Sequence, residues 1–443
     1  MSGRGWTGYL RSGTALGLLM IATAQASAGG FGIREQSAYG QGTSFAGIAA
    51  GGALSSMFWN PATMTQVPGI VNETSVTAIL PYSSNTPSAG SLVSAGFPGT
   101  SNVADAAFVP SGYTSYQWAP NLWLGVSVNA PFGLSVNFPD NWAGRDYAGQ
   151  TLLKTYNATP SIAWRINDWI SIGAGVQIQY AKATLEKGIG PVPGVVPPGV
   201  QGTLRGTGYA VGATAGVTLT PTPTTTIGVG WRSGLNQKIE GVVVTNAVLP
   251  LTTTGSATTT VDLPDIVSLG IRQRLDPRWT LLGTVEWSNW SRIGTSNITQ
   301  PSGSPVFVLG NAQSIPFQYR DGWFFSGGAE YIWTDRLTVR AGAGYEISPV
   351  TDQVRTPLVP DNNRVWASLG ASWKVFKGVH FDLAYSHIWV QDTSVNITAT
   401  SGNPSFNGIS YVGSVNSHVD ILSGSLVFRF DDIEPTVKRP FMN

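Results

Sequence analysis

The sequence predicts an all-β protein, a transmembrane antiparallel β-barrel of about fourteen strands with an N-terminal hatch in its lumen. The first observation is a long series of segments in which apolar residues alternate with small or polar residues. The second is that the apolar faces end in aromatic residues, as they do at the membrane interfaces of barrels. The third is the glycine-rich stretch Gly29 to Val67, which is too polar to cross a membrane and precedes all of these segments.

The composition excludes several classes of protein. Charged residues make up 11% of the 443-residue chain, and the mean hydropathy is +0.05. That hydropathy is far too low for a helical membrane protein and suits a wall whose residues alternate between lipid and water. The net charge of +1 gives no reason to expect a nucleic-acid partner. The absence of cysteine removes disulfides, zinc-thiolate sites and thiol nucleophiles, and no cofactor is expected.

Residues 1–28 are predicted to be a secretory signal peptide. A positively charged start precedes the apolar run Ala15 to Ala24, which is too short to span a bilayer. Ala26-Ser27-Ala28 then supplies the small-residue cleavage signal. The mature chain is therefore expected to begin at Gly29 and to be exported to the outer membrane of a Gram-negative bacterium.

Residues 29–69 are predicted to form the hatch, a compact segment inside the barrel. Its apolar anchors are Phe31, Phe45, Met57, Phe58 and Trp59. Asn60-Pro61-Ala62 matches the short box of water channels, but that box works at the ends of half-helices, and no helical span is present in this sequence. We therefore interpret these three residues as an Asn-Pro turn within the hatch.

Residues 70–430 are predicted to form the barrel. In Ile170–Tyr180, for example, isoleucine, valine and alanine alternate with serine, glycine and glutamine, so one face suits lipid and the other suits a lumen. The predicted strand centres are Val76, Tyr113, Val126, Thr159, Gly175, Ala213, Gly230, Leu269, Gly283, Gly327, Ala341, Leu369, Leu383 and Leu426. Gly206-x-Gly208 and Gly342-x-Gly344 lie inside strands, where a missing side chain leaves room for a hatch or a ligand.

The connections are predicted to differ between the two ends of the barrel. Short turns are expected at Asn167-Asp168, Asp276-Pro277, Thr334-Asp335 and Lys377-Gly378. Long polar loops are expected at 139–150, 188–201, 236–260, 300–314 and 396–415. This asymmetry is typical of periplasmic turns and extracellular loops. The tail, residues 431–443, is polar and is expected to be frayed.

Charged residues on the predicted inward face carry both signs: Arg272, Arg274, Glu286, Arg320, Glu330, Arg340, Glu346 and Asp382. Most are expected to form a network of ion pairs that holds the hatch to the wall. Arg320 is the exception, because it precedes Trp323 and Phe324, and a cation above an apolar slot suits an amphiphile with a carboxylate head. The histidines are too scattered for a metal site, and no spacing singles out a serine nucleophile, so no metal and no catalytic residue is predicted.

The segment Leu122–Gly144 begins as a strand and then breaks. Pro131 cannot donate to a ladder of hydrogen bonds, and Gly133 adds flexibility. A broken wall strand exposes backbone unless the hatch or water satisfies it. The break therefore predicts either a harmless distortion or a deliberate gap in the wall, and the apolar neighbours Phe132, Leu134 and Phe138 favour a gap that passes apolar solutes.

These motifs together resemble the FadL/toluene-transporter family of outer-membrane proteins. The resemblance is carried by the mature start GGFGIREQSAYGQGTSFAG, WNPA at Trp59 to Ala62, NAPFGL at Asn129 to Leu134, YRD at Tyr319 to Asp321, and the stretch Ser348 to Trp366. It runs from Gly29 to Phe430. It implies a monomeric fourteen-strand barrel with a hatch, which takes up long-chain fatty acids or hydrocarbons without an energy source.

The resemblance also implies roles for particular residues. Gly29, Gly30 and Phe31 would line or gate the ligand pocket, and Arg320 and Lys182 would contact a fatty-acid carboxylate. Lys182 points outward by simple alternation, so its role would need a bulge. Asn60, Pro61 and Ala62 would anchor the hatch. Asn129, Ala130, Pro131, Phe132, Gly133 and Leu134 would form a kink in the third strand, through which ligand leaves sideways.

We therefore predict a passive outer-membrane transporter of hydrophobic compounds, with long-chain fatty acids favoured over aromatic or aliphatic hydrocarbons because of Arg320. Its partners would be a hydrophobic small molecule and outer-membrane lipid. The alternatives are a hydrocarbon channel and a structural or adhesive surface barrel that transports nothing, which the polar loops would suit. A barrel enzyme is disfavoured by the lack of a nucleophile–base pair, and a general diffusion porin is disfavoured by the hatch.

Overall fold

The computed structural model describes residues 30–88, 91, 97–188, 200–245, 254–299 and 314–432. Its first half contains β1 (Ile70–Pro87), β2 (Thr100–Ser101), β3 (Ala107–Ala119), β4 (Leu122–Asn129), β5 (Gly133–Val136), β6 (Thr151–Arg165), β7 (Ile170–Gly188), β8 (Gln201–Thr222), β9 (Thr225–Arg232) and β10 (Leu235–Thr245). Its second half contains β11 (Thr254–Leu263), β12 (Ile266–Arg274), β13 (Trp279–Ser288), β14 (Thr295–Thr299), β15 (Ser314–Pro316), β16 (Gly322–Ile332), β17 (Leu337–Ile347), β18 (Arg364–Phe376), β19 (Val379–Val390), β20 (Thr393–Ile397) and β21 (Tyr411–Arg429).

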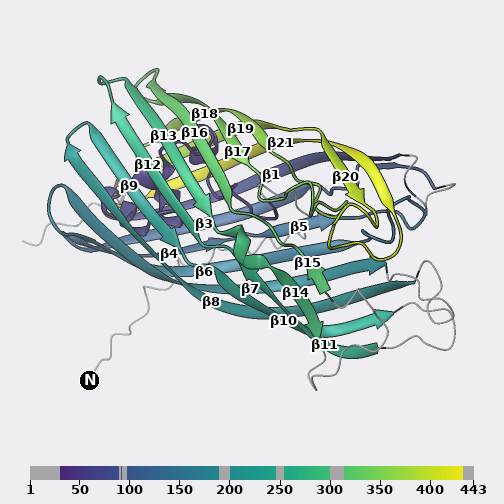
Figure 1. The fold of residues 1–443 in the computed structure, drawn as a ribbon. Helices are drawn as coiled ribbons and strands as arrows, with labels where there is room; N and C mark the ends of the chain where they lie inside the picture. The colour runs from purple at the N-terminus through teal and green to yellow at the C-terminus, as the bar shows by residue number, and fades with distance from the viewer. Residues whose placement is uncertain are drawn as a thin grey trace, which may run out of the picture.

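These strands form a closed barrel (Figure 1). The sheet closes because β1 pairs with β3 on one side and with β21 on the other. Several wall strands are interrupted, so that β4 and β5 share one position in the wall, as do β9 and β10, and β11 and β12. The predicted fourteen-strand antiparallel barrel is confirmed. Every predicted strand centre lies inside a strand of the wall.

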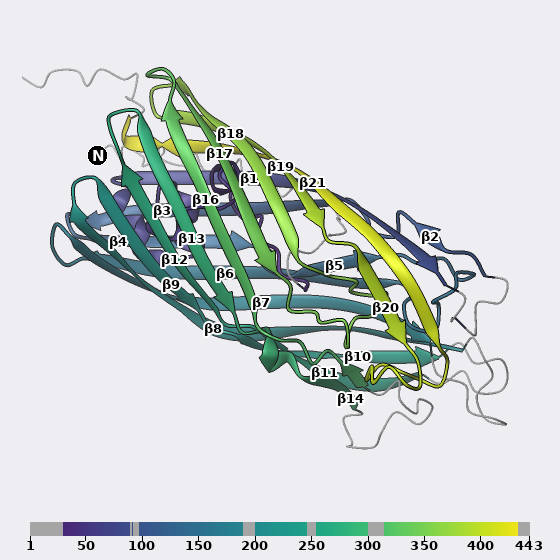
Figure 2. The same cartoon turned by 45° about the horizontal axis from the view of Figure 1, so that its top comes forward.

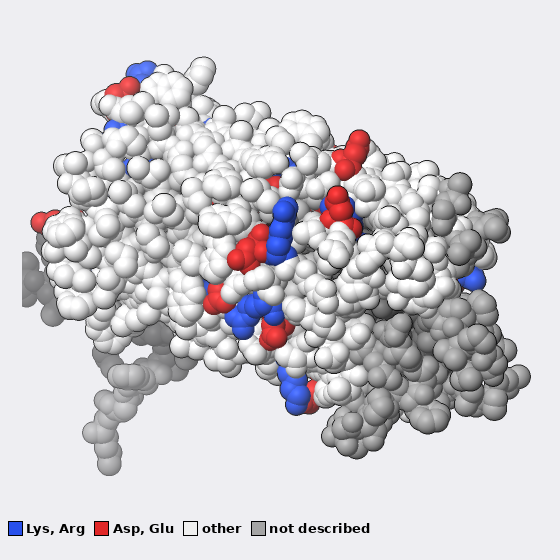
Figure 3. Space-filling model, viewed as in Figure 1, with Lys and Arg blue, Asp and Glu red and all other residues white. Residues whose placement is uncertain are grey.

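The wall carries its apolar face outside and its polar face inside, as a barrel in lipid requires. On β7, Ile172 and Val176 are 38% and 48% exposed, whereas Gln177 and Gln179 are buried toward the lumen. Aromatic side chains on the outside include Trp164, Trp231, Trp333, Trp373 and Trp389. A band of charged side chains crosses the face seen in Figure 3, and the surface between it and the turns is nearly free of charge.

The hatch consists of short helices inside the barrel: α1 (Ala38–Gln41), η1 (Ile48–Ala50), η2 (Leu54–Phe58) and η3 (Pro61–Gln66). They lie toward the end of the barrel that carries the short turns (Figures 1 and 2). The hatch is almost wholly buried, and its apolar side chains share one core with the inward face of the wall. No helix among the described residues is long and apolar enough to cross a membrane.

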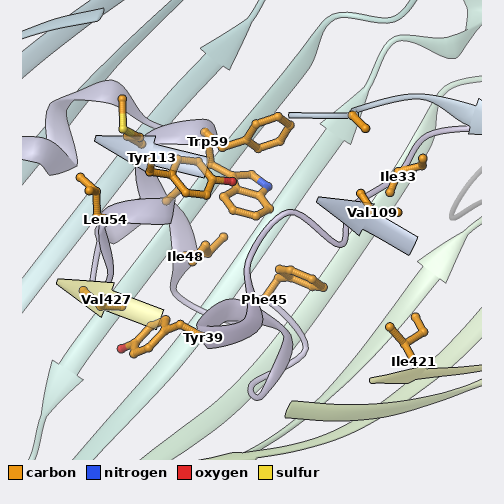
Figure 4. Packing of buried hydrophobic residues seen from close by; sticks show 14 of the residues in the cluster. Ile33, Tyr39, Phe45, Ile48, Leu54, Trp59, Val109, Tyr113, Ile421 and Val427 are labelled. Atoms are coloured by element: carbon orange, nitrogen blue, oxygen red, sulfur yellow. The ribbon is translucent and has the colours of Figure 1, made fainter. Parts of the chain in front are cut away.

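Aromatic rings carry much of this shared core. Phe45 of the hatch packs 5.6 Å from Trp59 and 6.2 Å from Trp366 of β18, measured between ring centroids. Trp59 also lies beside Tyr113 of β3 in Figure 4. Because such side chains each bury about 150–250 Å², a few of them stabilise the hatch against the wall.

Glycines of the wall bring its backbone close to the hatch. A Cβ atom on Gly342 would overlap the carbonyl of Thr43, and one on Gly173 would lie 2.5 Å from the backbone nitrogen of Ala62. The predicted role of Gly342 as space for the hatch is therefore confirmed. The same prediction is wrong for Gly206 and Gly208, because their near neighbours are backbone atoms of β10 in the wall itself.

The turns follow the prediction more closely than the loops. All four predicted short turns join consecutive strands. The loop predicted over 236–260 is wrong in large part, because β10 and β11 extend through it and pair from Leu235–Leu263 to Val244–Thr254. Valine and threonine favour such extended pairing. The predicted loop at 396–415 is shorter, since β21 begins at Tyr411, and the residues of 188–201 and 300–314 lie mostly outside the described part of the chain.

The two ends of the chain carry predictions that remain predictions. Residues 1–29 and 433–443 lie outside the described residues, so the signal peptide and most of the tail do too. The described start of the tail is hydrogen-bonded to the wall, because Asp431 accepts from the backbone N–H of Ile70 at 2.8 Å. Phe430–Asp432 form a 3-10 turn there, η6, which follows the last strand.

Candidate functional site: the hatch start and the broken strand

The break in the wall lies where predicted. β4 ends at Asn129 and β5 begins at Gly133, and both pair with β6 on one side. On the other side, β3 pairs with β4 up to Val128, whereas β5 has only an isolated bridge between Val136 and Ala104. The wall is therefore interrupted beside the residues between β4 and β5.

The first described residues of the hatch pair with this break as a short strand. Ile33 donates its backbone N–H to Pro131 at 2.8 Å, and Gly133 donates to the carbonyl of Phe31 at 2.9 Å. Gly32 and Phe132 are the bridge partners between these two bonds. The hatch thus satisfies backbone groups that the wall leaves unpaired.

Gln36 completes this pairing with its side chain, which is fully buried. Its amide oxygen accepts from the backbone N–H of Ala130 at 3.2 Å, and its amide nitrogen donates to the carbonyl of the same residue at 2.9 Å. Its own carbonyl accepts from the hydroxyl of Tyr113 at 2.5 Å, and Asn129 donates to that hydroxyl at 2.7 Å. One hatch glutamine therefore holds β3 and the end of β4 together.

Phe31 seats the start of the hatch in an aromatic cluster. Its ring lies 4.9 Å from Trp290, 5.9 Å from Phe317 and 6.5 Å from Phe132, measured between centroids. Trp290 belongs to the 3-10 helix η4 (Trp290–Ile293), and Phe132 belongs to the break. This cluster joins three separate segments beside the break, and the role of Phe31 as a gate residue stays a prediction.

Asp361 holds the first described residue of the hatch. Gly30 donates its backbone N–H to one oxygen of this carboxylate at 2.9 Å, and Ser348 donates to the same oxygen at 2.6 Å. Arg364 donates to the other oxygen at 2.9 and 2.5 Å. Asp361 and Arg364 are both buried. The connection from β17 to β18 therefore also holds the hatch start.

A cavity adjoins Gly30 and the first residues of β5. It has a volume of about 80 Å³ and opens to solvent. Its lining is mainly apolar and comes from the wall, the loops and the break: Val103, Leu134, Val136, Phe138, Leu358, Val359, Val390 and Val419, with Asp361 and Arg364 among them. An apolar cavity with one charged pair fits an apolar ligand that carries a single polar group.

Arg320 and Lys182 do not lie in this cavity. Arg320 is exposed, and its side chain donates to the carbonyl of Ser348 at 3.0 Å. Trp323 is 41% exposed on the outside of the wall, whereas Phe324 is buried, because consecutive residues of a strand face opposite sides. The predicted slot beneath Arg320 is therefore wrong. Lys182 is exposed on the outer face, in unbroken register with β6, so no bulge turns it inward.

The cation above Phe324 is Arg34 of the hatch. Its guanidinium carbon lies 3.8 Å from the centroid of that ring. Arg34 pairs with Glu286 at 2.5 Å and with Glu346 at 3.6 Å. Beside it, Glu35 is fully buried, and burial raises the pKa of its carboxyl to about 7. The hatch start is thus tied to the wall by charge as well as by backbone.

A second charge network lies under α1. Tyr39 donates its hydroxyl to Glu330, which also pairs with Arg272 at 2.6 Å and with Arg340 at 2.9 Å. Arg340 continues to Asp382 at 3.8 Å. The predicted ion pairs are thus present for six of the seven charges other than Arg320, and they include residues of the hatch. Arg274 departs from the prediction, since it is exposed and donates to the carbonyl of Pro223, as Arg320 does to that of Ser348.

Asn60, Pro61 and Ala62 lie deeper in the hatch. The side chain of Asn60 accepts from the backbone N–H of Ala62 at 3.0 Å and so caps η3, in which Pro61 takes the first position. Its amide nitrogen donates to Ala49 at 2.8 Å and to Val217 of β8 at 3.0 Å. A single buried asparagine therefore links two hatch segments to the wall.

Comparison with known proteins places these features in a family. The family model described as "Outer membrane protein transport protein (OMPP1/FadL/TodX)" matches residues 19–430. The chain belongs to this family. It is an outer-membrane protein of the FadL type, and the members of this family are transporters of hydrophobic compounds in Gram-negative bacteria.

Among curated relatives, a long-chain fatty acid transport protein of Escherichia coli is 26% identical over 430 residues, which cover 88% of this chain and 94% of the relative. A 47 kDa outer membrane protein of Pasteurella multocida is 27% identical over 397 residues, covering 84% and 89%. Among solved structures, a FadL homologue of Pseudomonas aeruginosa has a TM-score of 0.79 at 23% identity and covers 90% of this chain and 100% of its own. The toluene transporter TodX of Pseudomonas putida has a TM-score of 0.64 at 15% identity, covering 85% and 94%. These structures share the fold.

Sequence reasoning missed three residues that hold the site together, Gln36, Asp361 and Arg364. Gln36 belongs to the glycine-rich start, and the other two belong to the stretch Ser348 to Trp366 that carried the family resemblance. That stretch was a usable signal, although the pairing of Asp361 with Gly30 spans 331 positions of sequence. Gly29, the remaining predicted gate residue, lies outside the described residues. Among the described residues, no group of three or more His, Asp or Glu side chains is placed to hold a metal ion.

Proposed function

We propose that this protein takes up long-chain fatty acids passively, through the cavity beside Gly30 and a lateral exit at the broken strand. The observation that carries the proposal is that the hatch start is the pairing partner of the break, through Ile33–Pro131 and Gly133–Phe31. Movement of the hatch start would therefore unpair the break at the same moment. Because the chain closes its own barrel around its own cavity, we expect a monomer to suffice.

The charged pair in the cavity favours a ligand with a carboxylate. Arg364 holds Asp361 through its guanidinium group, and Asp361 in turn holds the N–H of Gly30. A ligand carboxylate that bound Arg364 would compete with Asp361 for the same donors, because guanidinium groups bind carboxylates in one planar geometry. Displacement of Asp361 would release Gly30 and loosen the hatch start. The name of the Escherichia coli relative, a long-chain fatty acid transport protein, agrees with such a substrate.

Lateral exit keeps an apolar chain out of water. Leaving water for hydrocarbon is favourable by about 0.8 kcal/mol per methylene. A watery pore would forfeit this gain, whereas an exit at the broken strand would pass the buried apolar side chains of Phe132 and Leu134. Free diffusion down this gradient needs no energy source.

A hydrocarbon channel is the second candidate, and the aromatic seat of Phe31 favours it. Trp290, Phe317 and Phe132 surround this ring and would equally accept a toluene ring. A hydrocarbon has no carboxylate, so its passage would not depend on Arg364. The two candidates therefore predict different effects of replacing Arg364 on uptake.

Uptake by cells that lack their own transporter tests both candidates. Cells expressing the chain would receive labelled oleate and labelled toluene, and we expect oleate uptake that falls at least tenfold in Arg364→Gln. Toluene uptake alone, unchanged by Arg364→Gln, would overturn the fatty-acid proposal in favour of a hydrocarbon channel. Uptake of neither compound by a folded barrel would support a structural surface protein.

A reversible lock tests the gate. The chain has no cysteine, and Gly32 and Phe132 are non-hydrogen-bonded partners, whose Cα atoms in such pairs lie about 4.5 Å apart, within reach of a disulfide. Oxidised Gly32→Cys/Phe132→Cys is expected to lose uptake, and reduction is expected to restore it. The control is Ala329→Cys/Ala341→Cys, a partner pair on β16 and β17 that does not involve the hatch. Full uptake through the oxidised lock would refute lateral exit at the break.

A further inference from the structure

Three tyrosines mark the outer edge of the lipid-facing band on β6, β7 and β8. Tyr156 is the register partner of Tyr180, and Tyr180 is the partner of Tyr209, whose ring lies 5.1 Å away. Tyr156 and Tyr209 are 48% and 71% exposed on the outside of the wall. Such a row is typical of the aromatic girdle at a membrane interface.

The distance along β7 agrees with this position. Trp169 is exposed at the turn end, and the outward residues from there to Tyr180 are apolar: Ile170, Ile172, Ala174, Val176 and Ile178. Eleven steps of about 3.3 Å, tilted by about 45°, rise roughly 26 Å. That height matches the apolar band of outer-membrane barrels, about 25 Å. Tyr180 therefore lies at the outer interface.

A basic cluster lies one or two outward positions beyond the tyrosines on the same face. Lys154 on β6 is the register partner of Lys182 on β7, and Arg205 on β8 is the partner of Thr184, the next outward residue. Lys182 and Arg205 are exposed, and Lys154 is partly exposed. Direct partners have Cβ atoms about 4.5–5.5 Å apart, and diagonal neighbours about 7–8 Å. The three cations therefore lie close enough together to contact the headgroup of one lipid.

None of the three cations forms an ion pair with a carboxylate of the described residues. Arg205 has a carboxylate at a diagonal position on each neighbouring strand, Glu186 on β7 and Glu240 on β10. Lys154 and Lys182 face each other directly, and neither has an acidic residue at a direct or diagonal position among the described residues. Like charges that face each other are unfavourable without a counter-ion, so this pair of lysines favours an anion from outside the chain.

We propose that Lys154, Lys182 and Arg205 bind the phosphate groups of a phosphorylated lipid in the outer leaflet. Arginine and lysine are the side chains that recognise phosphate, the first through its fork of donors and the second as a point charge. The cluster sits at headgroup depth, just outside an aromatic girdle, where a lipid phosphate lies and a free solute would be diluted by solvent. This also gives Lys182 a role that its outward direction allows.

The cluster borders the break in the wall. Lys154 is the register partner of Gly133, the first residue of β5. A lipid held by the cluster would therefore place its acyl chains beside the gap. The proposal itself concerns lipid binding alone and does not depend on which compound the protein transports.

Titration of the full-length purified protein with a bisphosphorylated lipid A, followed by native mass spectrometry, tests the proposal. We expect K154Q/K182Q/R205Q to bind this lipid about a hundredfold more weakly than the parent protein, at roughly 1 kcal/mol per cation. The charge-matched control is R274Q/R336Q/K374Q, whose positions are exposed at the turn end of the barrel. It is expected to bind as the parent does.

Two further measurements separate phosphate recognition from other causes of lipid binding. The parent protein is expected to lose its preference when the lipid is dephosphorylated, which separates phosphate recognition from burial of acyl chains. K154R/K182R preserves the charges and is expected to bind as the parent does, while a heat-modifiable shift in electrophoresis shows that each variant has a folded barrel. Equal affinity of the triple variant and the parent, or equal affinity for the dephosphorylated lipid, would overturn the proposal.

Discussion

Replacing Gln36 with leucine separates the hatch from the break without changing the volume of the side chain greatly. In the closed state, Gln36 supplies the partners of both the N–H and the carbonyl of Ala130. Leucine supplies neither, and Ala130 is buried. With the hatch moved, water reaches these groups, so the substitution penalises the closed state and leaves the open state nearly unchanged.

The size of the effect follows from the two bonds to Ala130, which are the shorter two of the three that the Gln36 side chain makes to the break and if lost leave buried backbone groups unpaired. A buried polar group left without a partner costs about 1–3 kcal/mol, so two such groups cost about 2–6 kcal/mol. A value near 3 kcal/mol raises the ratio of open to closed protein roughly 150-fold, since 1.4 kcal/mol is a factor of ten. We therefore expect Gln36→Leu to increase both oleate uptake and ion leakage through the barrel.

Conductance in planar bilayers and uptake in cells measure the two effects. The matched control is Gln41→Leu, because Gln41 is an equally buried hatch glutamine whose side chain bonds to Ile421 and Ser423 of β21 instead of to the break. It is expected to lower the stability of the hatch without increasing lateral uptake. If the two variants behaved alike, or if Gln36→Leu left both quantities unchanged in a folded barrel, the assigned role of Gln36 would be wrong.

Three further predictions concern the hatch. Glu330→Gln leaves two arginines and the hydroxyl of Tyr39 without their shared carboxylate, and it is expected to lower stability by about 3–5 kcal/mol, measured by thermal unfolding in detergent. Gly342→Val places a side chain against Thr43, so the barrel should fold with the hatch displaced and conduct ions like a porin; normal conductance would contradict this. Burial raises the pKa of Glu35 to about 7, so the proton it holds stabilises the seated hatch below pH 4.5, and this contribution is lost as pH rises toward about 7. Ion leakage should rise over that range and become independent of pH in Glu35→Gln.

The sequence determined the architecture of this protein because that architecture depends on local periodicity. Alternation along segments such as Ile170–Tyr180 fixes which face meets lipid, whatever the partner strand. The proline at position 131 likewise fixed the position of the break, since a residue without an N–H cannot continue a ladder. The predicted loop over 236–260 failed because polar threonines pair as readily in a strand as they lie in a loop, and sequence composition alone does not distinguish the two.

Only the tertiary structure decided which groups meet in the lumen. Arg320 precedes Phe324 in the sequence, yet it is Arg34 whose guanidinium group lies over the Phe324 ring. Arg34 is partly buried, whereas Arg320 is exposed. The N–H of Gly30 bonds to Asp361, 331 positions away, because closing the barrel brings the β17–β18 connection over the hatch start. Strand alternation repeats every two residues and assigns a face. It carries no information on which distant residue faces another across a closed lumen, so those contacts depend on how the whole barrel closes.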